Sequence, residues 1–565
     1  MSGENPMTAL VERIPVRIAW LLGTVGVAVL IGSTFLPWTY NPAILDNLTI
    51  LGLPSVTQFF SLVLALHAMF MLVMRLPALA AWRRVLGRQQ GLRRAGLGAF
   101  VYVLVVALAI ILQDDALLAA LDPGAWLALI GAALIWVAGV AIPSEDDVLA
   151  VHHRFPGWVE ILVVVALVAL GLGGAAYGLS LDDGAMLVAF LTFVGALLAG
   201  ASAGGFFDWV FVVTGHHRHV LILATFVAAF SFPITQDGSD ANMNIATNVL
   251  IFAATAMGLN IVVGLAGLLD LGYIAFLGAG AYVGAILSSS VFATVGLTPP
   301  FLVVVLIGAV VSAILGLIIG SPTLRVSGDY LAIVTLAFGE IFRLAMFNLD
   351  GNNGPNLTRG PNGIGAIPEL NLFGFDFGAS HTIGGVTFTR FANYYFLLLV
   401  VIGFIILVFT RLNNSRIGRG WIAIREDERA AEAMGVNTFG LKLLAFAGGA
   451  TLAGLAGTIK AHVDTAVSPD QYQFLESAFL IAAVVLGGMG TVVGVILGAV
   501  ILKLLPEKLR FFSENRLLLF GLLLVLMMRF RPEGLVASRR RKLEFHEEDE
   551  ALAQQVEHVY SEARS

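Results

Sequence analysis

Apolar runs long enough to cross a membrane recur along most of this 565-residue chain. A helix needs about 20 such residues to span the hydrocarbon core of a bilayer. The candidate spans in the first part are 16–36, 56–76, 97–113, 126–142, 158–179, 185–213 and 219–233; those in the second part are 243–264, 271–290, 299–320, 330–348, 394–410, 440–460, 475–503 and 516–530. The pattern predicts an all-α, polytopic membrane helix bundle of roughly 14–15 spans.

Composition supports the same class. Hydrophobic residues make up 58% of the chain and charged residues only 12%, whereas a soluble domain carries about 25% charged residues. The net charge of −6 does not favour nucleic-acid binding, and the absence of cysteine excludes disulfides and thiolate metal sites. The histidines are scattered, so no metal site is predicted.

The stretch 475–503 is too long for one straight span. Gly487, Gly488 and Gly490 interrupt its middle. We expect a broken pair of short helices around a re-entrant turn, since irregular backbone at membrane depth is tolerated where protein surrounds it. A single long tilted helix is the open alternative.

Loop charge predicts the orientation, because basic loops favour the cytoplasm. Three basic clusters qualify: Arg83, Arg84, Arg88, Arg93 and Arg94; Arg411, Arg416, Arg419 and Arg425; and Arg539, Arg540, Arg541 and Lys542. Residues 349–392 then lie outside, but the re-entrant interpretation also places Lys503 outside, against the rule. The polar run 234–244 divides the chain, giving an N-terminal membrane region 1–240 of about seven spans and unknown role, a core 241–536, and a charged cytoplasmic tail 537–565.

The cytoplasmic loop 411–440 is the most informative segment. Strong helix formers from Glu426 to Met434, with Gly435 placed as a C-cap, predict a short protruding helix. Ala430 and Ala431 would give it a smooth face able to enter a groove on another protein. Glu426, Asp427, Glu428 and Arg425 would supply charges at the rim. An amphipathic surface helix without a partner is the alternative.

Three other segments carry candidate sites. The glycine-rich run 258–287 suggests an interrupted helix beside a pathway or, equally, close helix packing. Glu340 and Arg343, three residues apart, form an ion pair that is structural or lines a pathway. The turn-rich external loop 349–368 is a partner contact or a solvated connector. Pathway candidates are Asn260, Gly264, Gly267, Tyr273 and Gly278, and candidates for contact with an external partner are Asn352, Asn353 and Asn362.

Five ordered segments within about 250–536 together resemble one family. They are the glycine-rich run 258–287, the span start 324–344, the external loop 349–368, the cytoplasmic loop 411–440 with its Ala430-Ala431-x3-Gly435 spacing, and a last segment with VVLGGMG at 484–490 followed by RPEGL at 531–535. The set resembles the LivM-type permeases of branched-chain amino-acid ABC importers. It departs from the family where Arg429 stands at the usual acidic position of the cytoplasmic loop.

The resemblance implies a function and partners. The chain would be a non-enzymatic permease of the bacterial inner membrane, working with a second LivH-type permease, two ATP-binding-cassette ATPases and a periplasmic substrate-binding protein. No phosphate-binding loop occurs in the sequence, so ATP and Mg are expected on the ATPases and no cofactor on this chain. Glu426, Asp427, Glu428, Ala430, Ala431 and Gly435 would couple to an ATPase.

Two alternatives stay open from sequence. An ion-gradient-driven secondary transporter would need ionisable groups in mid-membrane, for which Asp270, Glu340, Lys460 and Glu476 are the candidates. Urea or a short amide could also replace the amino acid as substrate. An intramembrane enzyme is not supported, because no nucleophile–base pair is recognisable.

Overall fold

The computed structural model describes residues 14–76, 89–114, 117–142, 155–288, 290–323, 329–352 and 354–508, with 518, 521–522, 525, 529 and 534–536. The chain divides into two compact units, Met1–Thr235 and Gln236–Ser565. They are described separately. The role expected for the N-terminal region stays a prediction, and the tail 537–565 lies outside the described residues.

The predicted polytopic helix bundle is confirmed. Within the described ranges, twelve helices are long and apolar enough to cross a membrane, and two shorter apolar helices, Ile274–Ile286 and Phe474–Gly487, accompany them. The last expected span, 516–530, lies mostly outside the described residues.

The first unit is built from helices alone among its described residues. These are α2 (Val16–Ser33), α3 (Val56–Val73), α5 (Gln89–Gln113), η2 (Leu117–Ala120), α6 (Pro123–Ala141), α7 (Gly157–Ser180), α8 (Gly184–Ala203), α9 (Phe206–His216), α10 (Arg218–Ser231) and η3 (Phe232–Gln236). Small residues let the helices approach closely, as in lipid generally: a Cβ on Gly26 of α2 would lie 2.8 Å from the Gly131 carbonyl oxygen of α6. The buried Trp38 indole closes the loop after α2 by donating to the Ser33 carbonyl over 2.8 Å.

The expected single span 185–213 is wrong in one respect. It breaks into α8 and α9 at Gly204 and Gly205, where Gly205 adopts a φ of 86°. This left-handed conformation costs glycine little and ends the helix, which hydropathy alone does not reveal.

The second unit carries the patterned loops. Its helices are α11 (Asp240–Leu259), the π-helix η4 (Asn260–Leu265), α12 (Ile274–Ile286), α13 (Phe301–Thr323), α14 (Asp329–Asn348), η5 (Gly360–Asn362), α15 (Arg390–Asn413), α16 (Arg416–Glu426), α17 (Glu428–Ala433), α18 (Thr438–Asp464), η6 (Pro469–Tyr472), α19 (Phe474–Gly487) and α20 (Val492–Lys508). Its strands form two short antiparallel hairpins, β1 (Asn371–Leu372) with β2 (Phe375–Asp376) and β3 (His381–Ile383) with β4 (Val386–Phe388).

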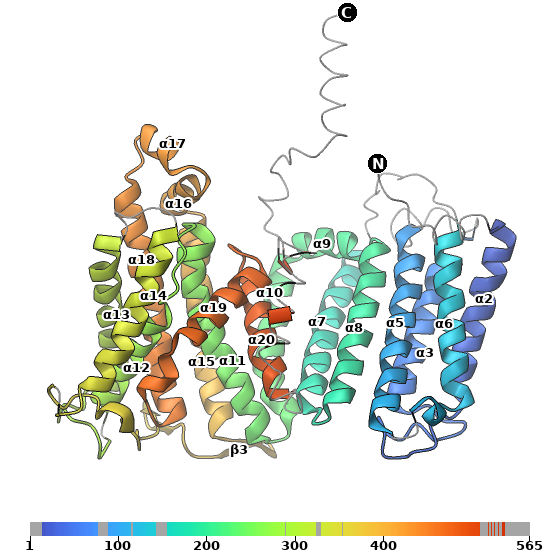
Figure 1. Cartoon of the computed structure of the whole chain (residues 1–565), viewed down its shortest axis with the longest axis horizontal. Coiled ribbons are helices and arrows are strands. Elements are labelled where there is room, and N and C mark those ends of the chain that lie inside the picture. The colour runs from blue at the N-terminus through green and yellow to red at the C-terminus, as the bar shows by residue number, and fades with distance from the viewer. Residues whose placement is uncertain are drawn as a thin grey trace, which may run out of the picture. The chain divides into compact units, whose positions relative to one another are not determined.

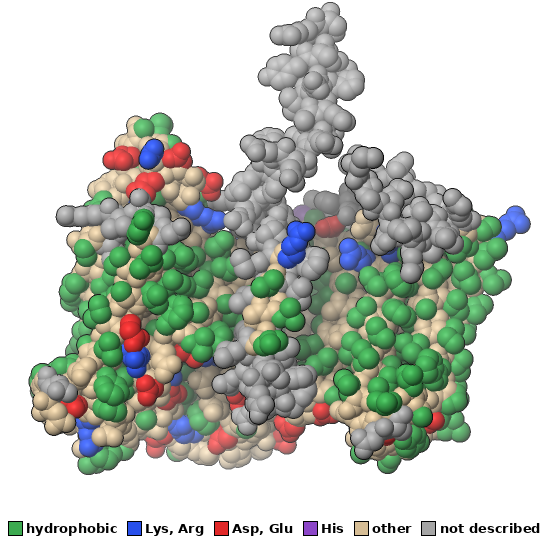
Figure 2. Space-filling view, in the orientation of Figure 1, with side chains coloured by type: hydrophobic (Ala, Val, Ile, Leu, Met, Phe, Trp, Pro, Cys, Tyr) green, Lys and Arg blue, Asp and Glu red, His purple; other side chains and the backbone are tan. Residues whose placement is uncertain are grey.

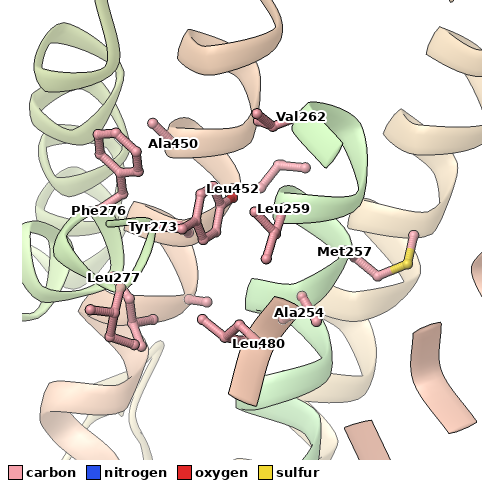
Figure 3. Close-up of a cluster of buried hydrophobic side chains, with 14 of the residues drawn as sticks. Ala254, Met257, Leu259, Val262, Tyr273, Phe276, Leu277, Ala450, Leu452 and Leu480 are labelled. Carbon is pink, nitrogen blue, oxygen red and sulfur yellow. The ribbon is translucent and has the colours of Figure 1, made fainter. Parts of the chain in front are cut away.

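The core of the second unit lies where α11, α12, α18 and α19 meet, and Figure 3 shows side chains from all four helices converging there. The fully buried Tyr273 donates its hydroxyl to the Gly449 carbonyl of α18 over 2.6 Å. Glycines bring α12 and α18 into backbone contact, because a Cβ on Gly280 would overlap the Gly454 carbonyl. This tight packing fixes α12 against α18.

The predicted break in 475–503 is confirmed, and a single long helix is wrong. Helices α19 and α20 pack against each other, and Gly488 and Gly490 between them have φ angles of 120° and 79°. Lys503 of α20 pairs with Glu476 of α19 over 3.0 Å. The pair gives Lys503 an acidic partner, which explains why a lysine occurs where the preference of basic residues for the cytoplasmic side does not predict one.

The loops of the second unit gather at its two ends. Figure 1 shows α16 and α17 beyond one end of α15 and α18, with β3 at the opposite end. The external segment is held down at this opposite end by Arg390, which pairs with Glu369 over 2.6 Å and donates to the Val463 carbonyl over 2.6 Å. The protruding helix and the external loop therefore occupy opposite ends, as expected.

Candidate coupling site and its link to the bundle

Two short helices, rather than one, form the protruding segment. Asp427 separates them in an extended conformation, with φ −155° and ψ 108°. Its carboxylate accepts hydrogen bonds from the backbone N–H groups of Arg429 (2.8 Å) and Ala430 (3.0 Å), which caps the start of α17. The expected helix therefore begins at Glu428 rather than Glu426, and Gly435 follows its end with a φ of 82°.

Both helices are attached firmly to the bundle. Trp421 of α16 is buried and donates its indole N–H to the Leu441 carbonyl over 2.6 Å. Glu428 of α17 pairs with Lys442 of α18, whose side chain is only 7% exposed. A force applied to α17 would therefore be carried to α18 by an ion pair and a packed aromatic ring.

The outer surface of α17 remains uncovered in this chain. Met434 is 84% exposed, and Ala430 is also exposed. Charged side chains surround this tip, as Figure 2 shows. Ala431 is instead buried against its own chain at 4% exposure, because successive helical residues point about 100° apart. The smooth outward surface thus combines Ala430 with Met434, and its role in coupling stays a prediction.

Arg425 links this segment to the interrupted helix. Its Nη1 donates to the Gly264 carbonyl in the π-helix η4 over 2.6 Å. The Arg425 side chain also covers Gly267, which has a φ of 71° and would place a Cβ 2.7 Å from Arg425 Cγ. The glycines expected near a pathway therefore make room for an arginine of the protruding segment.

Asn260 continues the link to the α19–α20 turn. It is fully buried at the start of η4, accepts from the Gly490 N–H over 2.8 Å and donates to the Thr491 carbonyl over 3.2 Å. π-Helical turns are rare and often mark functional positions. Together, Arg425 and Asn260 form a polar path from α16 through η4 to the turn between α19 and α20.

The other pathway candidates lie deeper in the core. Tyr273 is buried between α11 and α18, and Gly278 lies under two rings, with a Cβ there falling 2.7 Å from Phe342 and 3.0 Å from Tyr472. The candidates Asn260, Gly264 and Gly267 gather around η4, whereas Tyr273 and Gly278 belong to the α12 core. Their part in substrate passage stays a prediction.

The external candidates do not form one group. Asn352 is exposed, and both its backbone N–H (2.8 Å) and its side-chain amide (3.0 Å) bind the Asp350 carboxylate. Asn362 is exposed in η5, and Asn353 lies outside the described residues. Their role in binding a partner is untested.

Asp270 is a buried carboxyl between η4 and α12, outside the spanning helices. One carboxylate oxygen accepts from the Gly272 N–H over 3.0 Å, and the other has no partner among the described residues. Burial raises the pKa of Asp270 to about 7, although the hydrogen bond from the Gly272 N–H and the nearby Thr335 hydroxyl lower it.

This raised pKa predicts a pH-dependent stability. The folded chain holds the Asp270 proton to a higher pH than the unfolded chain, so the stabilisation is complete below about pH 4 and is lost as the pH rises through about 7. The loss amounts to at most about 4 kcal/mol. We expect Asp270→Asn to gain relative stability between pH 5 and pH 8, measured as unfolding temperature in detergent. Identical pH profiles for both proteins would refute the assignment.

Sequence reasoning missed three residues that the structure brings to these sites. Arg425 was expected in a basic loop and at the rim of the protruding helix but not in contact with Gly264, and Asp470 and Lys442 were not singled out. Asp470 joins Arg343 across 127 positions of sequence. The sequence shows only that each of these residues is charged and lies near the end of a span. That feature does not identify the residue that each one contacts.

Comparisons with known proteins converge on one group. A family profile described as branched-chain amino acid transport system / permease component matches residues 242–528. The permease protein LivM of the high-affinity branched-chain amino acid transport system of Salmonella typhimurium is 41% identical over 340 residues, covering 58% of this chain and 76% of that protein. LivM of Escherichia coli (strain K12) is 40% identical over the same length, with the same coverage.

A second permease type from the same transport system is also similar. LivH of Escherichia coli (strain K12) is 28% identical over 127 residues, covering 22% of this chain and 41% of that protein. No solved structure matches the chain.

Proposed function

Since the chain belongs to the family of branched-chain amino acid transport permeases, we propose that it is the translocation subunit of an ATP-driven importer for aliphatic amino acids in a bacterial inner membrane. The protein is a multi-pass membrane permease by its helices and its relatives. ATP and Mg would be bound by two partner ATPases. A periplasmic binding protein would deliver the substrate at the external segment, and a second, LivH-like permease would complete the pathway.

The observation that carries this proposal is the link between α17 and the interrupted helix. The tip of α17 offers an exposed apolar surface, and α17 itself is tied to α18 by the Glu428–Lys442 pair. The preceding helix, α16, is tied to η4 by Arg425. An ATPase that moves α17 would therefore move η4 and the α19–α20 turn.

Substitution of Met434 by glutamate tests the docking surface. A buried charge in place of an apolar anchor costs more than about 1 kcal/mol at an interface, so we expect about fivefold to tenfold weaker association with the ATPases and slower uptake. The measurements are co-purification of the ATPases and ATP-driven leucine uptake by the complete importer in proteoliposomes. Leu51→Glu is a matched control, because Leu51 is also apolar and 71% exposed but lies between α2 and α3.

Two results would contradict the proposal. One is unchanged association and uptake in Met434→Glu. The other is leucine uptake by this chain alone, driven by a proton or sodium gradient, which would favour the secondary transporter.

A further inference from the structure

A patch of three charged side chains lies on the surface of the second unit. Arg343 of α14 donates from Nε to both carboxylate oxygens of Glu340, over 3.0 and 3.1 Å, and its Nη1 lies 3.5 Å from Asp470 of η6. The Glu340 and Asp470 side chains are 44% and 65% exposed. In Figure 2, acidic and basic side chains gather over α14 among hydrophobic ones.

The depth of this patch argues against a lipid-facing position. Tyr330–Asn348 is a candidate span, and Arg343 and Glu340 precede its last residue by about 7 and 12 Å at 1.5 Å per residue. Charged groups that face lipid cost up to roughly 2.5–3.5 kcal/mol at the centre of a span, and charged groups within spans generally line a pathway or a protein contact. This cost favours a protein contact or a pathway, rather than acyl chains, as the surroundings of the patch.

Unsatisfied hydrogen-bonding groups lie beside the patch. The hydroxyls of Tyr282 and Tyr472 and the Oε1 of Gln471 are buried and have no partner among the described residues. Tyr472 is 1% exposed and Tyr282 2% exposed, and their rings lie 6.0 Å apart. The short helix η6, which holds Asp470, Gln471 and Tyr472, packs against both α12 and α14. Buried polar atoms normally have hydrogen-bond partners, so these three atoms are available to accept or donate to a ligand.

The chemistry of this set selects a cation with hydrogen-bond donors. Two carboxylates and one guanidinium leave one net negative charge, and Glu340 already engages the guanidinium through two of its nitrogens. The remaining acceptors are the Asp470 carboxylate, which the guanidinium reaches only at 3.5 Å, an amide oxygen and two hydroxyls. An ammonium offers three donors and no acceptor, so it complements these groups.

We infer that Asp470, with Gln471, Tyr282 and Tyr472, binds the α-ammonium group of the transported amino acid on its way between the permeases. This inference rests on the proposed function and adds a specificity rule to it. The site accepts amines and discriminates against uncharged amides and urea. The adjacent Phe342 ring, 6.4 Å from Tyr282, offers an apolar wall to an aliphatic side chain.

The test uses the complete importer, purified with and without the binding protein. Without it, direct binding of labelled leucine is measured in competition with isopentylamine, which keeps only the ammonium, and with 4-methylpentanoate, which keeps only the carboxylate. With it, leucine uptake and ATP hydrolysis stimulated by the binding protein are measured. The variants are Asp470→Asn and Tyr472→Phe, which keep side-chain shape, and the control is Asp237→Asn, an exposed carboxylate between η3 and α11.

We expect isopentylamine, but not 4-methylpentanoate, to displace leucine from the unmodified importer. Asp470→Asn should weaken isopentylamine binding and slow uptake at least tenfold, and Tyr472→Phe about threefold, while stimulated ATP hydrolysis stays within twofold of the unmodified level. Preferential displacement by 4-methylpentanoate, or unchanged amine binding in Asp470→Asn, would overturn the inference. A failure of the unmodified importer to take up leucine with ATP would instead refute the proposed function.

Discussion

Replacing Arg425 by glutamine should lower ATP-driven uptake about tenfold or more while ATP hydrolysis continues. The Nη1 of Arg425 joins α16 to the Gly264 carbonyl over 2.6 Å. A hydrogen bond from a charged donor contributes about 1.5–3 kcal/mol, and each 1.36 kcal/mol lost from a coupled step slows it tenfold. Glutamine is too short and uncharged to replace this contact, so movement of α17 would no longer pull on η4.

The decisive measurement is the number of leucine molecules imported per ATP hydrolysed. Arg419→Gln is the matched control, because Arg419 lies in the same helix but is exposed and reaches only the Asn414 carbonyl at 3.5 Å. We expect the control to keep the normal ratio. If Arg425→Gln keeps it too, the contact with η4 does not transmit the motion.

The polar path from α16 through η4 can also be tested at Asn260, where it reaches the turn between α19 and α20. Asn260→Leu removes the bonds to Gly490 and Thr491 and leaves buried backbone groups unpaired. If Arg425 and Asn260 act in series, the double variant should be little worse in coupling than either single variant.

Local features of the sequence were sufficient for much of the fold. Hydropathy located the long helices because a span is set by its own composition. The helix break near Gly488 was predictable because glycine adopts positive φ angles without strain. The protruding helix and its end at Gly435 followed from helix propensity and capping.

Contacts between distant segments could not be predicted in the same way. Arg425 and Gly264 are 161 positions apart, and Arg343 and Asp470 are 127 apart. A single sequence carries no signal for such pairs, because any arginine can satisfy many carbonyls or carboxylates. Ala431 points toward the bundle because α17 begins at Glu428, and the Asp427 cap determines this starting residue.

Replacing Gly457 by alanine should cost the folded bundle at least about 3 kcal/mol, since overpacking a close contact typically costs 1–3 kcal/mol and more where the obstacle is rigid. A Cβ on Gly457 of α18 would overlap the Leu277 carbonyl of α12 and lie 2.9 Å from the Ala281 nitrogen. Both obstacles are backbone atoms of a buried helix, so neither can rotate away. The helices would have to separate, and the core around Tyr273 would open.

The same helix supplies the control for this substitution. Gly448 has no atom within 4 Å of its would-be Cβ, so alanine there should only add helix propensity, up to about 1 kcal/mol. Unfolding temperature and monodispersity in mild detergent separate the two variants. Equal stability of Gly457→Ala and Gly448→Ala would mean that α12 and α18 are not in backbone contact. Because Gly280 meets Gly454 in the same groove, Gly280→Ala should reproduce the Gly457→Ala defect, which ties the loss to the helix pair rather than to one residue.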